Sequence, residues 1–507
     1  MRKSRTSASN LSSVALKGSM YNFFSLFVLK FGGLIFTVIL ARMLLPELFG
    51  VFALALSIST LLLSFTDFGL ENTFLRYLSE SVGKGNKEKS KGIINYFFKK
   101  KLILVVIVMI VLALSSKFLS YNVYNKPLLF YPLIFSCLFI IAESFRTLFA
   151  IIFTTKKDVK SILFFDSSSQ ILKILFSLFA ILVLSDKMVL SGIFIAFFLS
   201  SLLTFLLEYF ILFKKDKKLL SAKPGYFNKD KINSYWKFMG LATILLSVFG
   251  SIDILMLGKF VSSEYLGYYR ASLSLVMAIS SLLALSTIFL PIFTQIEGKR
   301  FERGFYKTLR YLLIFSIPAA LGTVFLSNYL IKLFYGNEYL LGTSTVYFLS
   351  IIILVSPLIG LYSTILQSKE KSKLISNSII IALIFNILLN LVILIFFNKE
   401  SLSTINLIAF STSLSKLILL FLLIYHVKKT LKLNFKLNKI GGMLISVSAM
   451  SLFLFLFNKS VNMNLFLGIF EVVSGALIYI LLLIMLRVLN KEDWGLLKNL
   501  IKNKKNE

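Results

Sequence analysis

The sequence predicts an all-α integral membrane protein with about 14 transmembrane helices. Three features predict this class: an apolar composition, recurring apolar segments about 20 residues long, and basic clusters between them. Of 507 residues, 57% are apolar and only 15% are charged, whereas soluble domains have about 25% charged residues. The mean hydropathy of +0.85 agrees with these fractions. A soluble fold of this size needs far more polar surface, so that class is excluded.

About fourteen segments are long and apolar enough to cross a bilayer as helices. The first follows a basic stretch without a small-residue cleavage site, so we interpret it as a retained helix and not a signal peptide. The predicted spans are residues 19–43, 50–75, 95–116, 128–153, 161–184, 187–213, 234–257, 263–291, 309–334, 340–367, 374–397, 402–427, 440–457 and 464–488.

Lysine and arginine are concentrated in every second loop, including residues 76–101, 214–231 and 428–439, and the intervening loops hold about one basic residue each. Because basic loops stay in the cytoplasm, both termini are predicted to be cytoplasmic. We expect a multi-pass protein of the inner (cytoplasmic) membrane. The net charge of +32 lies between apolar segments, which indicates contact with the lipid bilayer and not with nucleic acid.

The residue types that most enzymes need are scarce. One cysteine, Cys137, and one histidine, His426, exclude an intrachain disulfide, a zinc cluster and a histidine-based hydrolytic site. There is no Walker-type glycine loop, so direct use of ATP is not expected. The outer loops are too short for a membrane glycosyltransferase or polymerase. We predict a transporter and no enzyme, without a cofactor or metal, and leave coupling to H⁺ or Na⁺ open.

Two short motifs predict an internal duplication. A basic residue, a glutamate five positions later and a glycine three further recur where the first span meets the second and the seventh meets the eighth. These residues are Arg42, Glu47, Gly50 and Lys259, Glu264, Gly267. Basic turns at residues 154–160 and 367–373 form a second echo. An even number of spans in each half makes the repeats parallel, with a substrate site expected between the lobes.

The domain organisation follows from the repeat and from the longest polar stretch in mid-chain, which contains Lys, Pro and Gly. We predict an N-terminal six-helix lobe at residues 1–213 and a basic cytoplasmic linker at 214–233. A C-terminal six-helix lobe follows at 234–427. Two additional helices and a basic cytoplasmic tail occupy 428–507.

The segments ILARMLLPELFG at residues 39–50, SFTDFGL at 64–70 and FLRYL at 74–78 resemble the start of bacterial polysaccharide flippases. These are the Wzx-type proteins of the multidrug/oligosaccharidyl-lipid/polysaccharide (MOP) exporter superfamily. The resemblance extends over the whole chain through span count and lobe organisation. It implies flipping of polyprenyl-pyrophosphate-linked oligosaccharide repeat units to the outer leaflet by alternating access. The product is a cell-surface polysaccharide (O-antigen, capsule or exopolysaccharide), and a polymerase and glycosyltransferases are the implied partners.

Basic side chains inside the predicted spans are candidates for substrate binding. A charge at the bilayer centre costs roughly 2.5–3.5 kcal/mol, so it faces a cavity or a partner. A pyrophosphate loses water on entering such a cavity and needs cationic donors. The candidates are Lys30, Arg146, Lys173, Arg270 and Lys416.

Four acids in or beside the spans are predicted to form ion pairs with these cations or to bind a coupling ion. They are Asp67, Glu143, Asp166 and Asp253. Glu143 and Arg146 are three positions apart on one helix face and can pair. Asp253 is expected within reach of Arg270. Pairing competes with a cavity role, and the sequence leaves both open.

Two other transporters of the same superfamily are alternatives. A multidrug exporter needs an acidic cavity for cationic drugs, whereas the span at 19–43 carries Lys30 and no acid. A peptidoglycan-precursor flippase is not distinguished by this charge argument.

Overall fold

The computed structural model describes residues 2–283, 293, 298–397, 401–431, 440–460 and 465–489. Side chains are described from residue 31 onward, apart from positions 218, 220, 238, 239, 242 and 465. The described residues form helices and turns and no strand. Within this part, thirteen helices are long and apolar enough to cross a membrane. The predicted all-α membrane class is therefore confirmed.

The first helix, α1 (Arg2–Asp67), contains two of the predicted spans. Its backbone leaves the helical region at Leu45, with φ 59° and ψ 170°, immediately before Pro46. Proline lacks an N–H group and disfavours the α conformation in the residue before it, which explains a break here. Counted separately on the two sides of Leu45, the described spans agree with the predicted fourteen.

The predicted end of the second span at residue 75 is wrong. Helix α1 ends at Asp67, Gly69 adopts a left-handed φ of 74°, and a separate helix α2 (Leu70–Gly83) begins. The Asp67 carboxylate accepts a hydrogen bond of 2.8 Å from the backbone N–H of Glu71 in the first turn of α2. Such a bond satisfies an otherwise unpaired donor. The apolar face of α2 is buried through Leu70 and Phe74.

The chain forms two compact units. The first contains Met1–Ala271 and Ile379–Ile408, and the second contains Ser272–Ser378 and Ala409–Glu507. The predicted lobes at residues 1–213 and 234–427 stay a prediction.

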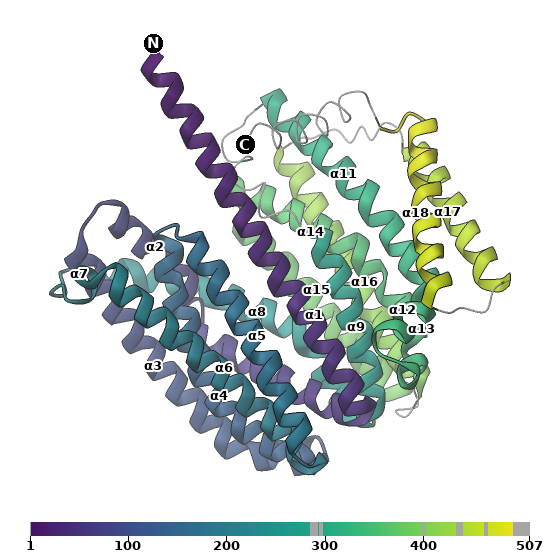
Figure 1. The fold of residues 1–507 in the computed structure, drawn as a ribbon, viewed down its shortest axis with the longest axis horizontal. Helices are drawn as coiled ribbons and strands as arrows, with labels where there is room; N and C mark the ends of the chain where they lie inside the picture. The colour runs from purple at the N-terminus through teal and green to yellow at the C-terminus, as the bar shows by residue number, and fades with distance from the viewer. Residues whose placement is uncertain are drawn as a thin grey trace. The chain divides into compact units, whose positions relative to one another are not determined.

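In the first unit, helices α3 (Lys87–Phe118), α4 (Phe130–Thr155), α5 (Val159–Val183) and α6 (Asp186–Lys215) run side by side (Figure 1). A π turn at Leu119–Val123 and a 3₁₀ turn at Pro127–Leu129 join α3 to α4. Buried Ser136 and Ser144 of α4 and Ser200 of α6 have small side chains that let membrane helices approach closely. The ring of Phe197 on α6 packs against Phe139 of α4 at 5.4 Å.

The predicted linker at 214–233 is folded against α3. It contains the short helix α7 (Lys217–Leu220), and α8 (Lys229–Phe260) begins before the predicted linker ends. The backbone N–H of Gly225 donates to the carbonyl of Glu88 at 2.8 Å. A Cβ on Gly225 would lie 2.9 Å from the Cβ of Glu88, so this close approach requires glycine. Phe227 packs on Tyr96 with ring centres 5.4 Å apart.

Helices α9 (Ser263–Leu283), α15 (Ser372–Phe396) and α16 (Leu402–Leu431) each contribute residues to both units. The second unit also contains α11 (Gly298–Phe325), α12 (Ser327–Phe334), the 3₁₀ turn Asn337–Gly342, α13 (Thr343–Leu349) and α14 (Ile351–Ser368). The predicted span at 309–334 is thus divided at Leu326, and most of the span at 340–367 is α14.

The two additional C-terminal helices, α17 (Ile440–Ser460) and α18 (Leu465–Met485), lie side by side (Figure 1). Their buried residues Met443, Val447 and Tyr479 form one apolar cluster with Ile314 of α11. The Tyr479 hydroxyl donates to the Ile314 carbonyl at 2.8 Å, which satisfies a buried polar group.

Candidate functional site

The two glycines of the repeated motif contact each other's segments in the first unit. A Cβ on Gly50 would lie 1.8 Å from the carbonyl oxygen of Ser263 and 2.9 Å from the nitrogen of Gly267. A Cβ on Gly267 would lie 2.0 Å from the carbonyl oxygen of Pro46. Pro46 precedes Glu47 just as Ser263 precedes Glu264, so the contact is reciprocal. This reciprocity favours the predicted duplication.

The charged members of both motifs are exposed: Arg42, Glu47, Lys259 and Glu264. The Tyr268 hydroxyl donates to the carboxylate of Glu264. Beside the motif contact, the ammonium of Lys126 donates to the carbonyl of Val261 at 3.0 Å. The glycines therefore make the contact, and the charges surround it.

The predicted pair of Glu143 and Arg146 on α4 is confirmed. Arg146 donates through Nε at 2.8 Å and through Nη2 at 2.5 Å to the two carboxylate oxygens of Glu143. Ser201 of α6 donates a further hydrogen bond of 2.8 Å to Glu143. Two-point bonding of this kind is the strongest geometry open to arginine and a carboxylate. The predicted role of Arg146 in substrate binding requires this pair to open.

Lys173 and Asp166, both on α5, adjoin this pair. The Lys173 ammonium lies 5.1 Å from the ring centre of Phe197 and interacts electrostatically with Glu143. Asp166 is half-buried and interacts electrostatically with Arg146. The structure thus brings four of the predicted site residues together: Glu143, Arg146, Asp166 and Lys173.

One acid in this neighbourhood was missed by the sequence analysis. Glu208 of α6 is fully buried, and its Oε1 lies 4.0 Å from Nη1 of Arg146. Its only sequence signal is that it is the one charged residue between Lys187 and Lys214 in α6. Sequence spacing alone does not indicate that α6 places this residue beside α4.

Asp253 of α8 is buried at a second polar cluster of the first unit. Its Oδ1 accepts from the amide of Asn390 at 2.8 Å, and its Oδ2 accepts from the hydroxyl of Tyr269 at 3.1 Å. Asn390 and Asn386 lie one turn apart on α15 and were also missed. Oδ1 of Asn390 and Nδ2 of Asn386 are buried without a hydrogen-bond partner among the described residues. The predicted pair of Asp253 with Arg270, which is half-buried on α9, stays a prediction.

A third cluster involves the acids at the junction of α1 and α2. Lys101 of α3, with only 1% of its side chain exposed, lies 3.3 Å from Oε1 of Glu71. Thr147 of α4 donates to the same oxygen at 2.6 Å. Asp67, the last residue of α1, lies at this cluster because its carboxylate accepts from the backbone N–H of Glu71. Lys101 was counted with the basic loop at residues 76–101, but it lies within α3, which begins at Lys87 and buries this side chain.

The structure places the remaining two predicted cations by their helix alone. Lys416 is half-buried on α16, in the second unit, and its neighbours in sequence Ser413 and Ser415 are buried. Lys30 belongs to α1, and its side chain lies outside the described residues.

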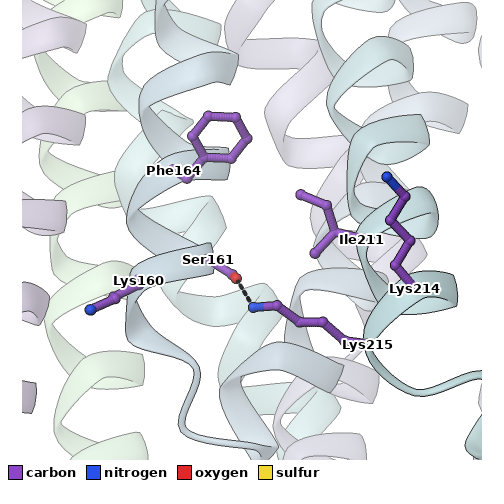
Figure 2. Close-up of a pocket in the computed structure, with 6 residues that line it drawn as sticks. All are labelled: Lys160, Ser161, Phe164, Ile211, Lys214 and Lys215. Atoms are coloured by element: carbon purple, nitrogen blue, oxygen red, sulfur yellow. Dashed lines mark hydrogen bonds between the residues drawn. The ribbon is translucent and has the colours of Figure 1, made fainter.

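A basic groove of about 400 Å³ lies where α5 begins and α6 ends (Figure 2). Its lining consists of Lys160, Ser161, Phe164, Ile211, Lys214 and Lys215. The Lys215 ammonium lies 2.5 Å from Asp158 and 2.9 Å from Ser161. Burial opposes ionisation of Asp158, but the hydrogen bonds from Lys215 and Ser161 and the charge of Lys215 together outweigh it and lower the pKa of Asp158 below its usual value. None of the predicted site residues lines this groove.

Comparison with known families identifies the chain. The model of the family described as "Polysaccharide biosynthesis protein" matches residues 15–297, which is more than half of the 507 residues. The chain belongs to this family. The model of the MatE family also matches, at residues 239–392. The suspected membership of the MOP exporter superfamily is thereby confirmed.

One curated relative is the "Probable low-salt glycan biosynthesis flippase Agl15" of Haloferax volcanii. It is 22% identical over 267 residues, which cover 51% of this chain and 54% of the relative. The chain thus matches about half the length of this relative.

Solved structures show the same fold. The "Lipid II flippase MurJ, inward closed conformation" superposes with a TM-score of 0.69 at 19% identity, over 93% of this chain and 99% of that chain. An inward-facing multidrug resistance MATE transporter of the MOP superfamily gives a TM-score of 0.57 at 13% identity, over 82% and 96%. At these identities the likeness concerns the fold alone.

Proposed function

We propose that this protein flips polyprenyl-pyrophosphate-linked oligosaccharide repeat units from the cytoplasmic to the outer leaflet of the inner membrane by alternating access. The observation that carries the proposal is the polysaccharide-biosynthesis family match at residues 15–297. The flippase name of the Haloferax volcanii relative and the MOP fold support it. The polysaccharide made from these units is displayed at the cell surface, with a polymerase and glycosyltransferases as the proposed partners.

The proposed substrate contacts are the basic side chains within the spans. Lysine attracts a pyrophosphate as a point charge, and arginine binds two of its oxygens at once. The structure supports Lys173 as a candidate for substrate contact. Its ammonium lies over the ring of Phe197, and the neighbouring acid Glu143 already accepts hydrogen bonds from Arg146 and Ser201. We also propose substrate contacts for three cations from their positions within the predicted spans: Lys30, Arg270 and Lys416.

The proposed direction of transport agrees with the membrane potential. Because the cytoplasm is electrically negative, moving an anion outward is favourable by about 2.3 kcal/mol per charge per 100 mV. With both termini in the cytoplasm, as the loop charges predict, the basic loops also attract the substrate on the side where it is made. If the coupling ion is Na⁺, we propose Asp253 as the acid that binds it, because the unpartnered Oδ1 of Asn390 offers a second oxygen beside its carboxylate.

Replacing Lys30 with alanine tests the proposed substrate role in cells. We expect the Lys30→Ala variant, at normal protein levels, to abolish surface polysaccharide, while the lipid-linked glycan accumulates on the cytoplasmic leaflet. Lys30→Arg keeps the charge and should retain part of the export. Lys84→Ala, which removes an exposed lysine paired with Glu80, is the matched control and should export normally.

These variants, together with a strain that lacks the gene, separate the proposed substrate from the two alternative substrates. Wild-type levels of export by Lys30→Ala contradict the role of this lysine. If deletion of the gene stops cell-wall synthesis and leaves surface polysaccharide intact, the substrate is a peptidoglycan precursor. If deletion leaves both intact and sensitises cells to cationic drugs, the protein is a multidrug exporter.

A further inference from the structure

Glu208 is a buried acid whose hydrogen bonds are missing. Its side chain is 0% exposed, and neither carboxyl oxygen has a hydrogen-bond partner among the described residues. Buried polar groups are nearly always hydrogen-bonded, and an ionised carboxylate without partners is the most costly exception. The state of this carboxyl group therefore needs an explanation.

The charges that act on Glu208 come from α4 and α5, which pack against α6. Helix α4 presents Arg146 and Glu143, and α5 presents Asp166, while Lys173 of α5 acts on Glu143. Beyond the end of α6, the ammonium of Lys217 on α7 lies over the ring of Phe213, 5.6 Å from its centre. Arg146 is thus the cation that acts on all three acids, Glu208, Glu143 and Asp166.

Arg146 does not neutralise Glu208 in this conformation. Its Nε and Nη2 are both bonded to Glu143, and its Nη1 lies 4.0 Å from Glu208, beyond hydrogen-bond length. A second anion beside an engaged pair gains too little attraction to offset the desolvation of its charge, which costs several kcal/mol per ion. The neutral carboxylic acid avoids that cost.

We propose that Glu208 is a proton-binding site, protonated in this conformation, and that it competes with Glu143 for Arg146. Release breaks the O–H bond of the carboxylic acid. The proton passes to water, the electron pair stays on the carboxylate, and Nη1 of Arg146 moves into bonding range.

Infrared spectroscopy of the purified full-length protein at neutral pH tests proton binding directly. We expect the wild type to show the carbonyl stretch of a protonated carboxyl, and Glu208→Gln to lose intensity equivalent to one group. Glu80→Gln, which removes an exposed and ion-paired acid, should leave this band unchanged. An identical band in wild type and Glu208→Gln means that Glu208 is ionised, and overturns the proposal.

The thermal unfolding midpoint gives a second readout that does not depend on spectral overlap. Glutamine has the shape of a neutral glutamic acid and removes no charge from a protonated site, so Glu208→Gln should unfold close to the wild-type midpoint. An ionised Glu208 that stabilises Arg146 predicts a clear loss of stability instead, which contradicts the proposal.

The transport role of this proton rests on the proposed function and is tested separately. In vesicles, flipping by the wild type should change with pH, and flipping by Glu208→Gln should lose that dependence. A retained pH dependence places the proton outside the transport cycle and overturns the coupling role. If the wild type flips no glycolipid, the proposed function fails, while the infrared result still decides whether Glu208 binds a proton.

Discussion

Alanine at Gly50 is expected to separate the two motif segments. Its Cβ would lie 1.8 Å from the carbonyl oxygen of Ser263, far inside the 3.4–4 Å of ordinary contact, and backbone atoms have to move. Overpacking of this kind costs typically about 1–3 kcal/mol. Such an energy shifts the population of conformations by about 5- to 150-fold. We therefore expect the transport rate to fall at least about fivefold.

Cysteine labelling measures the separation without a transport assay. In a Cys137→Ser background, a cysteine at Ser263 should react at least about fivefold faster with a water-soluble maleimide when Gly50 is alanine, following the same shift. Gly267→Ala should give the same result from the other side, because the contact is reciprocal. Gly33→Ala is the matched control on α1, since a Cβ there meets nothing within 4 Å. Equal labelling in all variants contradicts a close contact.

Removing Arg146 is expected to have the largest effect on stability. Arg146→Met leaves the buried carboxylate of Glu143 without its hydrogen-bonded cation. Breaking one side of a buried ion pair costs about 3–5 kcal/mol, whereas replacing both partners by neutral groups of similar volume is often nearly neutral. The double variant Glu143→Gln with Arg146→Met should therefore recover most of the loss. Unfolding midpoints in detergent measure both variants.

The control for this prediction is an exposed pair. Lys84→Met breaks the salt bridge to Glu80, which lies at the surface, and should leave the midpoint unchanged. If Arg146→Met is as stable as the wild type, the pair does not stabilise the bundle of α4, α5 and α6.

The sequence predicted features that depend on neighbours along the chain. The span count follows from apolar segment length, and the pair of Glu143 and Arg146 follows from i, i+3 spacing on one helix. The break at Leu45 lies between two predicted spans, beside Pro46. In each case the physical cause is local in the sequence.

Features that depend on packing between helices were missed. Asn390 contacts Asp253 across 137 positions of sequence, and Lys101 contacts Glu71 across 30. Glu208 lies beside Arg146 only because α4 packs against α6. The end of the second span was misplaced because Gly69 interrupts an apolar stretch that hydropathy reads as continuous.

Flipping by the purified protein tests the central proposal most directly. The protein is reconstituted into vesicles with a fluorescent polyprenyl-pyrophosphate-linked oligosaccharide, and an impermeant reagent modifies the glycan in the outer leaflet only. We predict that wild-type protein lets the reagent reach nearly all of the glycolipid, while protein-free vesicles stop at the outer half. Lys30→Ala should resemble the protein-free vesicles. If wild-type protein also stops at half, it does not flip this class of substrate.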